Sequence, residues 1–353
     1  MVAATVRPSL DAPVTSMMAK PVFGYSRDGA IPHRPTFKEI FSEFIDSINF
    51  TIDMNRGLIA LNLIFHIGTG VIFANYVFKY LSPGSLIFVL AALVFIGTFY
   101  NTIWFHRYCS HVAFKFSRRQ YALILSWTSP LFFRESTYAI PHRVHHQCAE
   151  KPGDPYGPHL GWLGSYFAIE SSMKLNPNMT QRQYELICRS VNHIGLKVNS
   201  YASYQRTGSI EDIAYYLGKT LFAQVFWSSI IVLVAGEAYV FAWYSSIFLT
   251  TALIRDFNWR GHGGNFRKVK KLRWEYDTKS RALNQHFYGY IASEWHDNHH
   301  KYPFSANNGF LPGQFDIAFQ IIKLMHRLRI VESYVDAKPL FENECLGLSG
   351  TNQ

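Results

Sequence analysis

A long apolar run at residues 220–254 restricts the fold of this chain more than any other feature. As one straight helix it would be about 52 Å long at 1.5 Å per residue, whereas the hydrocarbon core of a bilayer is about 30 Å thick. Gly236 and Glu237 divide the run near its middle. We therefore predict two short membrane spans, at residues 220–235 and 238–254.

Two earlier segments, residues 57–80 and 85–105, are also apolar over the length that a bilayer requires. The turn residues Ser82, Pro83 and Gly84 separate them. Only 16% of the 353 residues are charged, against about 25% in typical soluble proteins. The sequence thus predicts an all-α membrane protein with four transmembrane helices.

We expect one membrane domain at residues 36–335, preceded by a mobile segment at 1–35 and followed by a tail at 336–353. The N-terminus lacks a charged stretch followed directly by an apolar one, so we expect no cleaved signal peptide. The four cysteines form no C-x2-C pair, which argues against a zinc ribbon and a disulfide framework.

Nine of the 15 histidines fall in four short clusters beside the ends of apolar segments. Two clusters have the spacing i, i+3, i+4, which places three imidazoles on one face of a helix. In another, two histidines five positions apart would lie about 140° apart on an ideal helix. That spacing suits a helix end, where the two imidazoles approach metal ions from different sides. The clusters are His106 and His111; His142, His145 and His146; Asn258 with His262; and His296, His299 and His300.

Neutral imidazole is the commonest metal ligand in proteins, and many imidazoles with few carboxylates suit Zn, Cu, Fe or Ni rather than Mg or Ca. Nine imidazoles exceed the roughly four to six ligands that one ion takes, so we infer two ions. A structural zinc site would normally use cysteine and four ligands. A redox pair that activates dioxygen for an apolar substrate fits a site at a membrane surface better.

All four clusters must lie on the same side of the membrane if they are to share one site. Two predicted spans precede the first cluster, and two more separate the second cluster from Asn258 and those that follow. An even number of crossings returns the chain to the same side each time. A single span at 220–254 would have put the clusters on opposite sides.

The basic residues indicate which side this is. Of the 34 Lys and Arg residues, only Lys79 falls in a loop on the opposite side. The positive-inside rule therefore places the histidine clusters in the cytosol, on a helical cap. The net charge of +10 indicates a face against anionic lipid rather than a nucleic-acid partner.

A membrane metal transporter is the alternative from a different functional class. Transporters carry ionisable groups inside their spans, whereas the predicted spans contain only His66, which we expect to be a hydrogen-bonded packing residue. Metal analysis separates the two classes, because an enzyme of the kind inferred should hold two redox-active metal ions per chain.

Four shorter segments have helical patterns outside the spans. Residues 36–50 are amphipathic and start with a capping box of Thr36 and Glu39. This helix could lie in the bilayer interface or pack on the cytosolic cap, and the sequence leaves both open. Further helices are expected at residues 118–133, 180–195 and 314–328.

With the clusters in place, the chain resembles the membrane-bound fatty acid desaturases, in particular the acyl-CoA desaturases. The resemblance covers roughly residues 57–335. It implies four transmembrane helices under a cytosolic cap with a di-iron centre, in which the nine histidines bind two Fe²⁺ ions and Asn258 holds one iron through water. The implied reaction uses O2 to remove two hydrogens from a fatty acyl chain.

The chain departs from that pattern in three places. After the second cluster, the sequence that starts at Asp154 and Pro155 reaches His159 sooner than in ordinary acyl-CoA desaturases. A basic insert occupies residues 267–273, and Ala-Ser-Glu-Trp precedes His296. These changes concern how the acyl group is held. Two related outcomes therefore stay open, namely oxidative decarboxylation of a free fatty acid to a terminal alkene and hydroxylation of the acyl chain.

Other residues are candidates for supporting roles. Carboxylates near the clusters could orient the imidazoles by hydrogen bonds, and the basic insert could hold a carboxylate or a CoA phosphate. Trp162, in a His-x-Gly-Trp sequence similar to one in the family, is a further substrate candidate, and four other tryptophans could line an acyl tunnel or anchor the protein at the interface. The carboxylates are Asp154, Asp256, Glu294 and Asp297; the basic residues are Lys268, Lys270, Lys271 and Arg273; the tryptophans are Trp104, Trp127, Trp259 and Trp295.

The electrons for such a reaction must come from another protein. The chain contains no C-x-x-C-H haem site, no cysteine set for an iron–sulfur cluster and no convincing dinucleotide fingerprint. We therefore expect an external donor of the ferredoxin, rubredoxin or cytochrome type. The expected substrate is a fatty acid or fatty acyl thioester.

Overall fold

The computed structural model describes residues 18, 24, 33–149, 153–262 and 295–346. The predicted mobile segment at 1–35 lies almost entirely outside these residues, as do Glu294 and the basic insert with Lys268, Lys270, Lys271 and Arg273.

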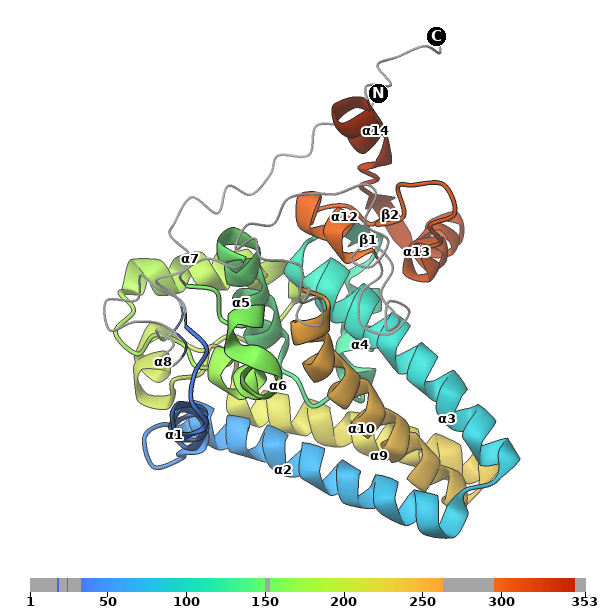
Figure 1. Cartoon of the computed structure of the whole chain (residues 1–353), viewed down its shortest axis with the longest axis horizontal. Coiled ribbons are helices and arrows are strands. Elements are labelled where there is room, and N and C mark those ends of the chain that lie inside the picture. The colour runs from blue at the N-terminus through green and yellow to red at the C-terminus, as the bar shows by residue number, and fades with distance from the viewer. Residues whose placement is uncertain (1–17, 19–23, 25–32, 150–152, 263–294, 347–353) are drawn as a thin grey trace.

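Four helical segments are long and apolar enough to cross a membrane, as predicted. They form two hairpins whose turns lie close together at the lower right of Figure 1, while the opposite ends meet the cap. The segments are α2 (Met54–Asn75) with the π-helical end η2 (Tyr76–Tyr80), α3 (Pro83–Phe95) with η3 (Ile96–Ser110), α9 (Ile213–Ala235) and α10 (Glu237–Arg260).

The two hairpin turns follow from local chemistry. Ser82 caps α3 through a capping box with Ser85, and Pro83 occupies the first turn of the helix, where its missing N–H costs nothing. Between α9 and α10, Gly236 has φ 92° and ψ 169°, a conformation that side chains with a Cβ rarely adopt. The predicted division at Gly236 is confirmed.

Small polar residues let α10 pack closely against its neighbours. Ser245, Ser246 and Thr250 are fully buried, and their hydroxyls donate to backbone carbonyls of their own helix. The hydroxyl of Ser246 also lies 3.2 Å from the carbonyl oxygen of Val89 in α3. Small residues at helix contacts are typical of membrane bundles, and here they hold α10 at the centre of the bundle.

The remaining elements form a cap at one end of the bundle (Figure 1). Helices predicted near 118–133, 180–195 and 314–328 are confirmed as α4, α7 and α13. The cap elements are α1 (Phe37–Ile48), β1 (Phe114–Phe116), α4 (Arg119–Thr128), α5 (Glu135–Cys148), η4 (Pro158–Leu160), α6 (Gly161–Ser172), α7 (Gln181–Val191), η5 (Asn192–Ile194), α8 (Tyr201–Thr207), α12 (His296–Lys301), α13 (Ile317–Arg327), β2 (Val331–Tyr334) and α14 (Lys338–Leu346).

Helix α1 leaves part of its apolar face exposed. The capping box of Thr36 and Glu39 is present, and the hydrogen bonds from Thr36 lower the pKa of Glu39 to about 2. Phe37, Phe41 and Ile45 are 70%, 55% and 44% exposed. Ile40, however, is buried against Tyr156 and Leu160 of the cap, and the ring of Phe44 contacts that of Phe167. The helix therefore packs on the cap, as one of the two interpretations held, while its exposed side chains suit the bilayer interface.

Two parts of the cap depart from the sequence-based expectation. Strands β1 and β2 form a small antiparallel ribbon within an otherwise helical protein. Residues 338–346, expected to be part of a tail, form α14, and Phe341 is fully buried against Tyr302 and Phe310. The ordered unit thus extends past the predicted boundary at residue 335.

Candidate metal centre

The four histidine clusters meet at the cap end of the bundle and form two groups. In the first group, five imidazoles present nitrogens that all lie within 4.8 Å of one another. Neighbouring Nε2 atoms are 2.8 Å apart between His142 and His111, 2.9 Å between His299 and His146, and 3.0 Å between His106 and His299. The members of the first group are His106, His111, His142, His146 and His299.

The second group lies beside the first and contains four imidazoles. Nitrogens of His145, His262 and His300 lie within 4.8 Å of one another. His296 joins them, because its Nε2 is 3.1 Å from Nε2 of His262 and 3.0 Å from Nε2 of His300. All nine predicted histidines are therefore brought together, five in one group and four in the other.

Helix α5 distributes its three histidines between the groups. His142 and His146 are four positions apart and share a helix face, as the spacing predicts, and both belong to the first group. His145 lies between them and points to the second group. One rigid helix therefore fixes how far apart the two groups lie.

The end of the second span differs from the expected α-helix. Residues Ile96–Ser110 form a π-helix, a rare conformation with i→i+5 hydrogen bonds that is found mostly at functional sites. The amide of His111 accordingly donates to the carbonyl of His106, five residues earlier. Residues five apart are then about one turn apart, so His106 and His111 join the same group instead of diverging by the angle expected for an α-helix.

Five of the imidazoles outside the spans have a lowered pKa, which favours their neutral form. Burial, followed by the neighbouring imidazoles, lowers the pKa of His111, His142 and His146 well below the usual value. The same two causes lower the pKa of His299 and His300. Neutral imidazole is the form that binds a metal through its lone pair.

The donor atoms fit metal ions. Nε2 of His145 is buried and has no hydrogen-bond partner among the described residues, although Nδ1 of the same ring is 2.8 Å from Oδ1 of Asp154. Nε2 atoms about 3.0 Å apart match neighbouring ligands at right angles around an ion with bonds of about 2.1 Å. Nitrogen donors without carboxylates in either group suit Zn, Cu, Fe or Ni.

A cavity adjoins both groups. His106 and His142 of the first group border it, as do His145, His262 and His296 of the second. The rest of its wall is mainly apolar and aromatic, and Asn258 belongs to it as well. That part of the wall includes Phe133, Tyr138, Tyr156, Ile169, Met173, Ile254 and Phe257.

The family model of fatty acid desaturases matches residues 83–331, a range that contains all four histidine clusters. This chain belongs to the fatty acid desaturase family. The resemblance inferred from the sequence is confirmed, and the family is one of membrane oxidoreductases that act in lipid metabolism.

Individual desaturases are related to this one at low identity. It is 24% identical over 233 residues to the chloroplastic palmitoyl-monogalactosyldiacylglycerol delta-7 desaturase of Arabidopsis thaliana, a match that covers 64% of this chain and 56% of the relative. It is 24% identical to the acyl-CoA C20 Delta5-desaturase of Anemone leveillei, covering 66% and 68%. The acyl-CoA 5-desaturase AL21 of the same plant is 23% identical, covering 66% of each chain. The chain thus spans little more than half the length of the first relative.

An arginine inside each of the first two histidine clusters holds the site together. Arg143, between His142 and His145, donates to the carbonyl oxygens of Ser110 and Cys109 at 2.6 and 2.9 Å. It thereby ties α5 to the end of η3. Arg107, next to His106, pairs with Asp316 at 2.7 Å and ties the first cluster to the segment that follows α12. Sequence reasoning missed both arginines, although each directly follows a cluster histidine.

Among the carboxylates predicted to orient the imidazoles, Asp154 lies in the expected place. Its side chain is fully buried and contacts His145. Asp256 does not: it accepts hydrogen bonds from Trp162 at 2.9 Å and from Arg260 at 2.5 Å, so its prediction is not supported. Glu294 and the side chain of Asp297 lie outside the described part of the structure.

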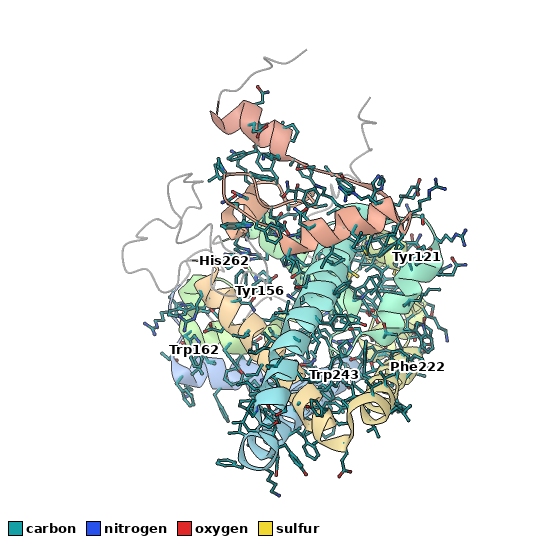
Figure 2. All side chains as sticks on the ribbon, turned by 90° about the vertical axis from the view of Figure 1, so that its right-hand side faces the viewer. Tyr121, Tyr156, Trp162, Phe222, Trp243 and His262 are labelled. Carbon is teal, nitrogen blue, oxygen red and sulfur yellow. The ribbon has the colours of Figure 1, made fainter. Side chains whose placement is uncertain are left out.

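The tryptophans do not form the cavity wall. Trp162 is 44% exposed and bonds to Asp256, and Figure 2 shows it well away from Tyr156 and His262. None of the five candidate tryptophans is among the residues that border the cavity in the described part of the chain. Phenylalanine, tyrosine and aliphatic residues supply that wall instead. His66 is hydrogen-bonded to Thr251 and Tyr166, as expected of a packing residue.

Proposed function

We propose that this protein is an O2-dependent di-iron desaturase of fatty acyl chains. The observation that carries the proposal is the position of two groups of imidazoles against a mainly apolar cavity. His106, His111, His142, His146 and His299 would hold one Fe²⁺, and His145, His262, His296 and His300 the other. Asn258, on the cavity wall, would hold one iron through water. The irons would supply the one-electron chemistry that an unactivated C–H bond requires.

The overall reaction balances with an external source of electrons. One O2, two electrons and two protons, together with two hydrogens from neighbouring methylenes, give a carbon–carbon double bond and two waters. Among the described residues we find no haem-binding or iron–sulfur motif, so a ferredoxin, a rubredoxin or a cytochrome would supply the electrons.

The substrate would be a fatty acyl group bound as a thioester, in a lipid or as a free acid. The names of the relatives include both acyl-CoA and a galactolipid acyl chain, which supports the first two forms. Residues such as Phe133, Ile169 and Met173 would exclude water from the bound acyl chain. Placement of the chain would decide which methylene faces the metal groups.

Oxidative decarboxylation to a terminal alkene and hydroxylation are the alternatives on the same scaffold. They differ from desaturation in where the chain is attacked or in the fate of the oxidised carbon. The family match supports desaturation.

The site would face the cytosol. Its support is the charge distribution: Lys79 lies at the hairpin end opposite the cap, and the second hairpin turn at Gly236 and Glu237 carries no basic residue. Positive residues concentrate on the cytosolic side of membrane proteins.

Product analysis tests the proposal directly. Cells would express the wild-type chain, His299→Ala or His326→Ala, and gas chromatography with mass spectrometry would be run on total fatty acids and on the headspace. His299 belongs to the first group, whereas His326 is an exposed cap residue whose ring bonds to the carbonyl of Val331. Iron would be measured in each purified protein.

The expected result is a new unsaturated fatty acid with wild type and His326→Ala, none with His299→Ala, and two irons per wild-type chain. A volatile alkene one carbon shorter than a cellular fatty acid would move the assignment to decarboxylation, and a hydroxy acid would move it to hydroxylation. Wild-type protein that binds zinc alone would refute the di-iron chemistry.

A further inference from the structure

The segment from Asp154 to Tyr156 reaches both metal groups. The hydroxyl of Tyr156 lies 2.8 Å from Nδ1 of His142, a member of the first group. The ring of Tyr156 stacks on that of His145, a member of the second group, with centroids 4.6 Å apart and planes at 23°. Tyr156 is buried, borders the cavity and lies close to His262 in Figure 2.

The direction of the bond follows from the imidazole. Nε2 of His142 faces the first group, 2.8 Å from Nε2 of His111 and 3.2 Å from Nε2 of His146. A neutral imidazole that offers its Nε2 lone pair to a metal carries its proton on Nδ1. His142 therefore donates from Nδ1 to the phenol oxygen of Tyr156, which fixes both the tautomer and the orientation of the ring.

The position of Tyr156 is itself fixed by a hydrogen bond to its backbone. Its backbone N–H donates to Oδ1 of Asp154 at 3.1 Å, and the same oxygen lies 2.8 Å from Nδ1 of His145. The two side chains thus act through one short, buried segment, in which Asp154 orients an imidazole of the second group and Tyr156 orients one of the first.

We propose that Tyr156 is a positioning residue that fixes His142 toward the first metal and, with Asp154, sets the two metal positions relative to each other. The proposal rests on the metal centre of the proposed function, and it adds a residue that sequence reasoning did not single out. Loss of such an outer partner typically costs about 10- to 100-fold in metal affinity.

Tyr156→Phe and Tyr138→Phe form a matched pair for the test. Both rings border the same cavity, and the ring of Tyr138 also lies against His142, with centroids 6.0 Å apart. The hydroxyl of Tyr138, however, bonds to Oδ1 of Asn101 at 3.1 Å rather than to an imidazole. Each variant removes one hydroxyl and keeps the cavity wall.

Co²⁺ is the probe, added to the full-length apoprotein in detergent. Its affinity is measured by competition with a chelator and its ligand geometry by visible absorption. Thermal unfolding of the apoprotein is measured in parallel, because a purely structural role would change it. Wild type and Tyr138→Phe should bind two Co²⁺ with the same two affinities. Tyr156→Phe should bind one Co²⁺ at least about tenfold more weakly, with an altered spectrum and an unchanged apoprotein melting temperature.

The proposal is overturned if Tyr156→Phe binds both ions like wild type, if Tyr138→Phe weakens binding equally, or if the apoprotein of Tyr156→Phe alone is destabilised. Absence of Co²⁺ binding by wild type overturns it together with the metal centre. Failure of the proposed reaction is separate, since it appears as the absence of a new double bond while two Co²⁺ still bind.

Discussion

Removal of the Arg107 guanidinium should leave a buried carboxylate without its counter-charge. Arg107 and Asp316 are each 1% exposed, and Nη2 lies 2.7 Å from Oδ2. Asp316 keeps two backbone partners, the amides of Asn308 and Phe319 at 2.8 and 2.9 Å. The carbonyl of Ala306, which accepts a 2.5 Å hydrogen bond from Nη1, loses that donor.

The magnitude follows from what is left behind. Breaking a buried ion pair by removing one partner costs about 3–5 kcal/mol, and a buried carbonyl that loses its donor costs about 1–3 kcal/mol. The two costs overlap, because the carboxylate and the carbonyl both border the space that the guanidinium leaves, and the protein relaxes around both at once. We expect Arg107→Met to lower the free energy of unfolding by about 3–5 kcal/mol.

A double-mutant cycle separates the charge from the packing. Urea unfolding of the detergent-solubilised protein, followed by tryptophan fluorescence, would be measured for Arg107→Met, Asp316→Asn and the double variant. The amide that replaces the carboxylate carries no charge. The loss of unfolding free energy in the double variant should therefore be smaller than the sum of the two single losses by about 0.5–3 kcal/mol, the usual range for residues in contact.

Two results would contradict this reasoning. A loss below about 1 kcal/mol for Arg107→Met, the usual limit for exposed pairs, would mean that the pair is not isolated from solvent. Strict additivity of the two single variants would mean that the charges do not interact and that the loss comes from packing alone.

Three further predictions concern the site, the cavity and α1. Asp154→Asn should weaken metal binding by about 10- to 100-fold and Asp256→Asn should not, as measured by chelator competition; equal losses would contradict the role given to Asp154. Met173→Trp should shift products toward shorter acyl chains at unchanged iron content, because it fills the cavity; an unchanged chain-length profile in the lipid analysis would place the substrate elsewhere. A spin label at Phe41→Cys should be accessible to lipid-soluble oxygen and one at Ser42→Cys to an aqueous nickel chelate, since only Phe41 lies on the exposed apolar face of α1; equal accessibility would rule out an interfacial helix.

The sequence predicted the features that depend on local pattern. Apolar length determines where a chain crosses a bilayer, so four spans and the division at Gly236 could be predicted and are confirmed. Helical spacing likewise predicts that His142 and His146 share a face. Counting the membrane crossings predicted that all four clusters lie on the same side of the membrane.

Features that depend on tertiary contacts could not be predicted in the same way. The π-helix at Ile96–Ser110 continues α3 without a break, so the sequence did not indicate the π-helical turn that brings His106 and His111 into one group. Tyr156 lies eleven positions after His145 and contacts it only because the chain folds back. Asp256 is near the clusters in sequence, but its carboxylate is taken by Trp162 and Arg260.

The order of the ligands along the chain has a consequence for biosynthesis. Four imidazoles of the first group, from His106 to His146, are synthesised early, and the fifth is His299. The second group has only His145 until His262 emerges, after the second hairpin of spans has been made. Four of the five imidazoles of the first group are thus present before the second hairpin is made, whereas the second group gains three of its four imidazoles only after it.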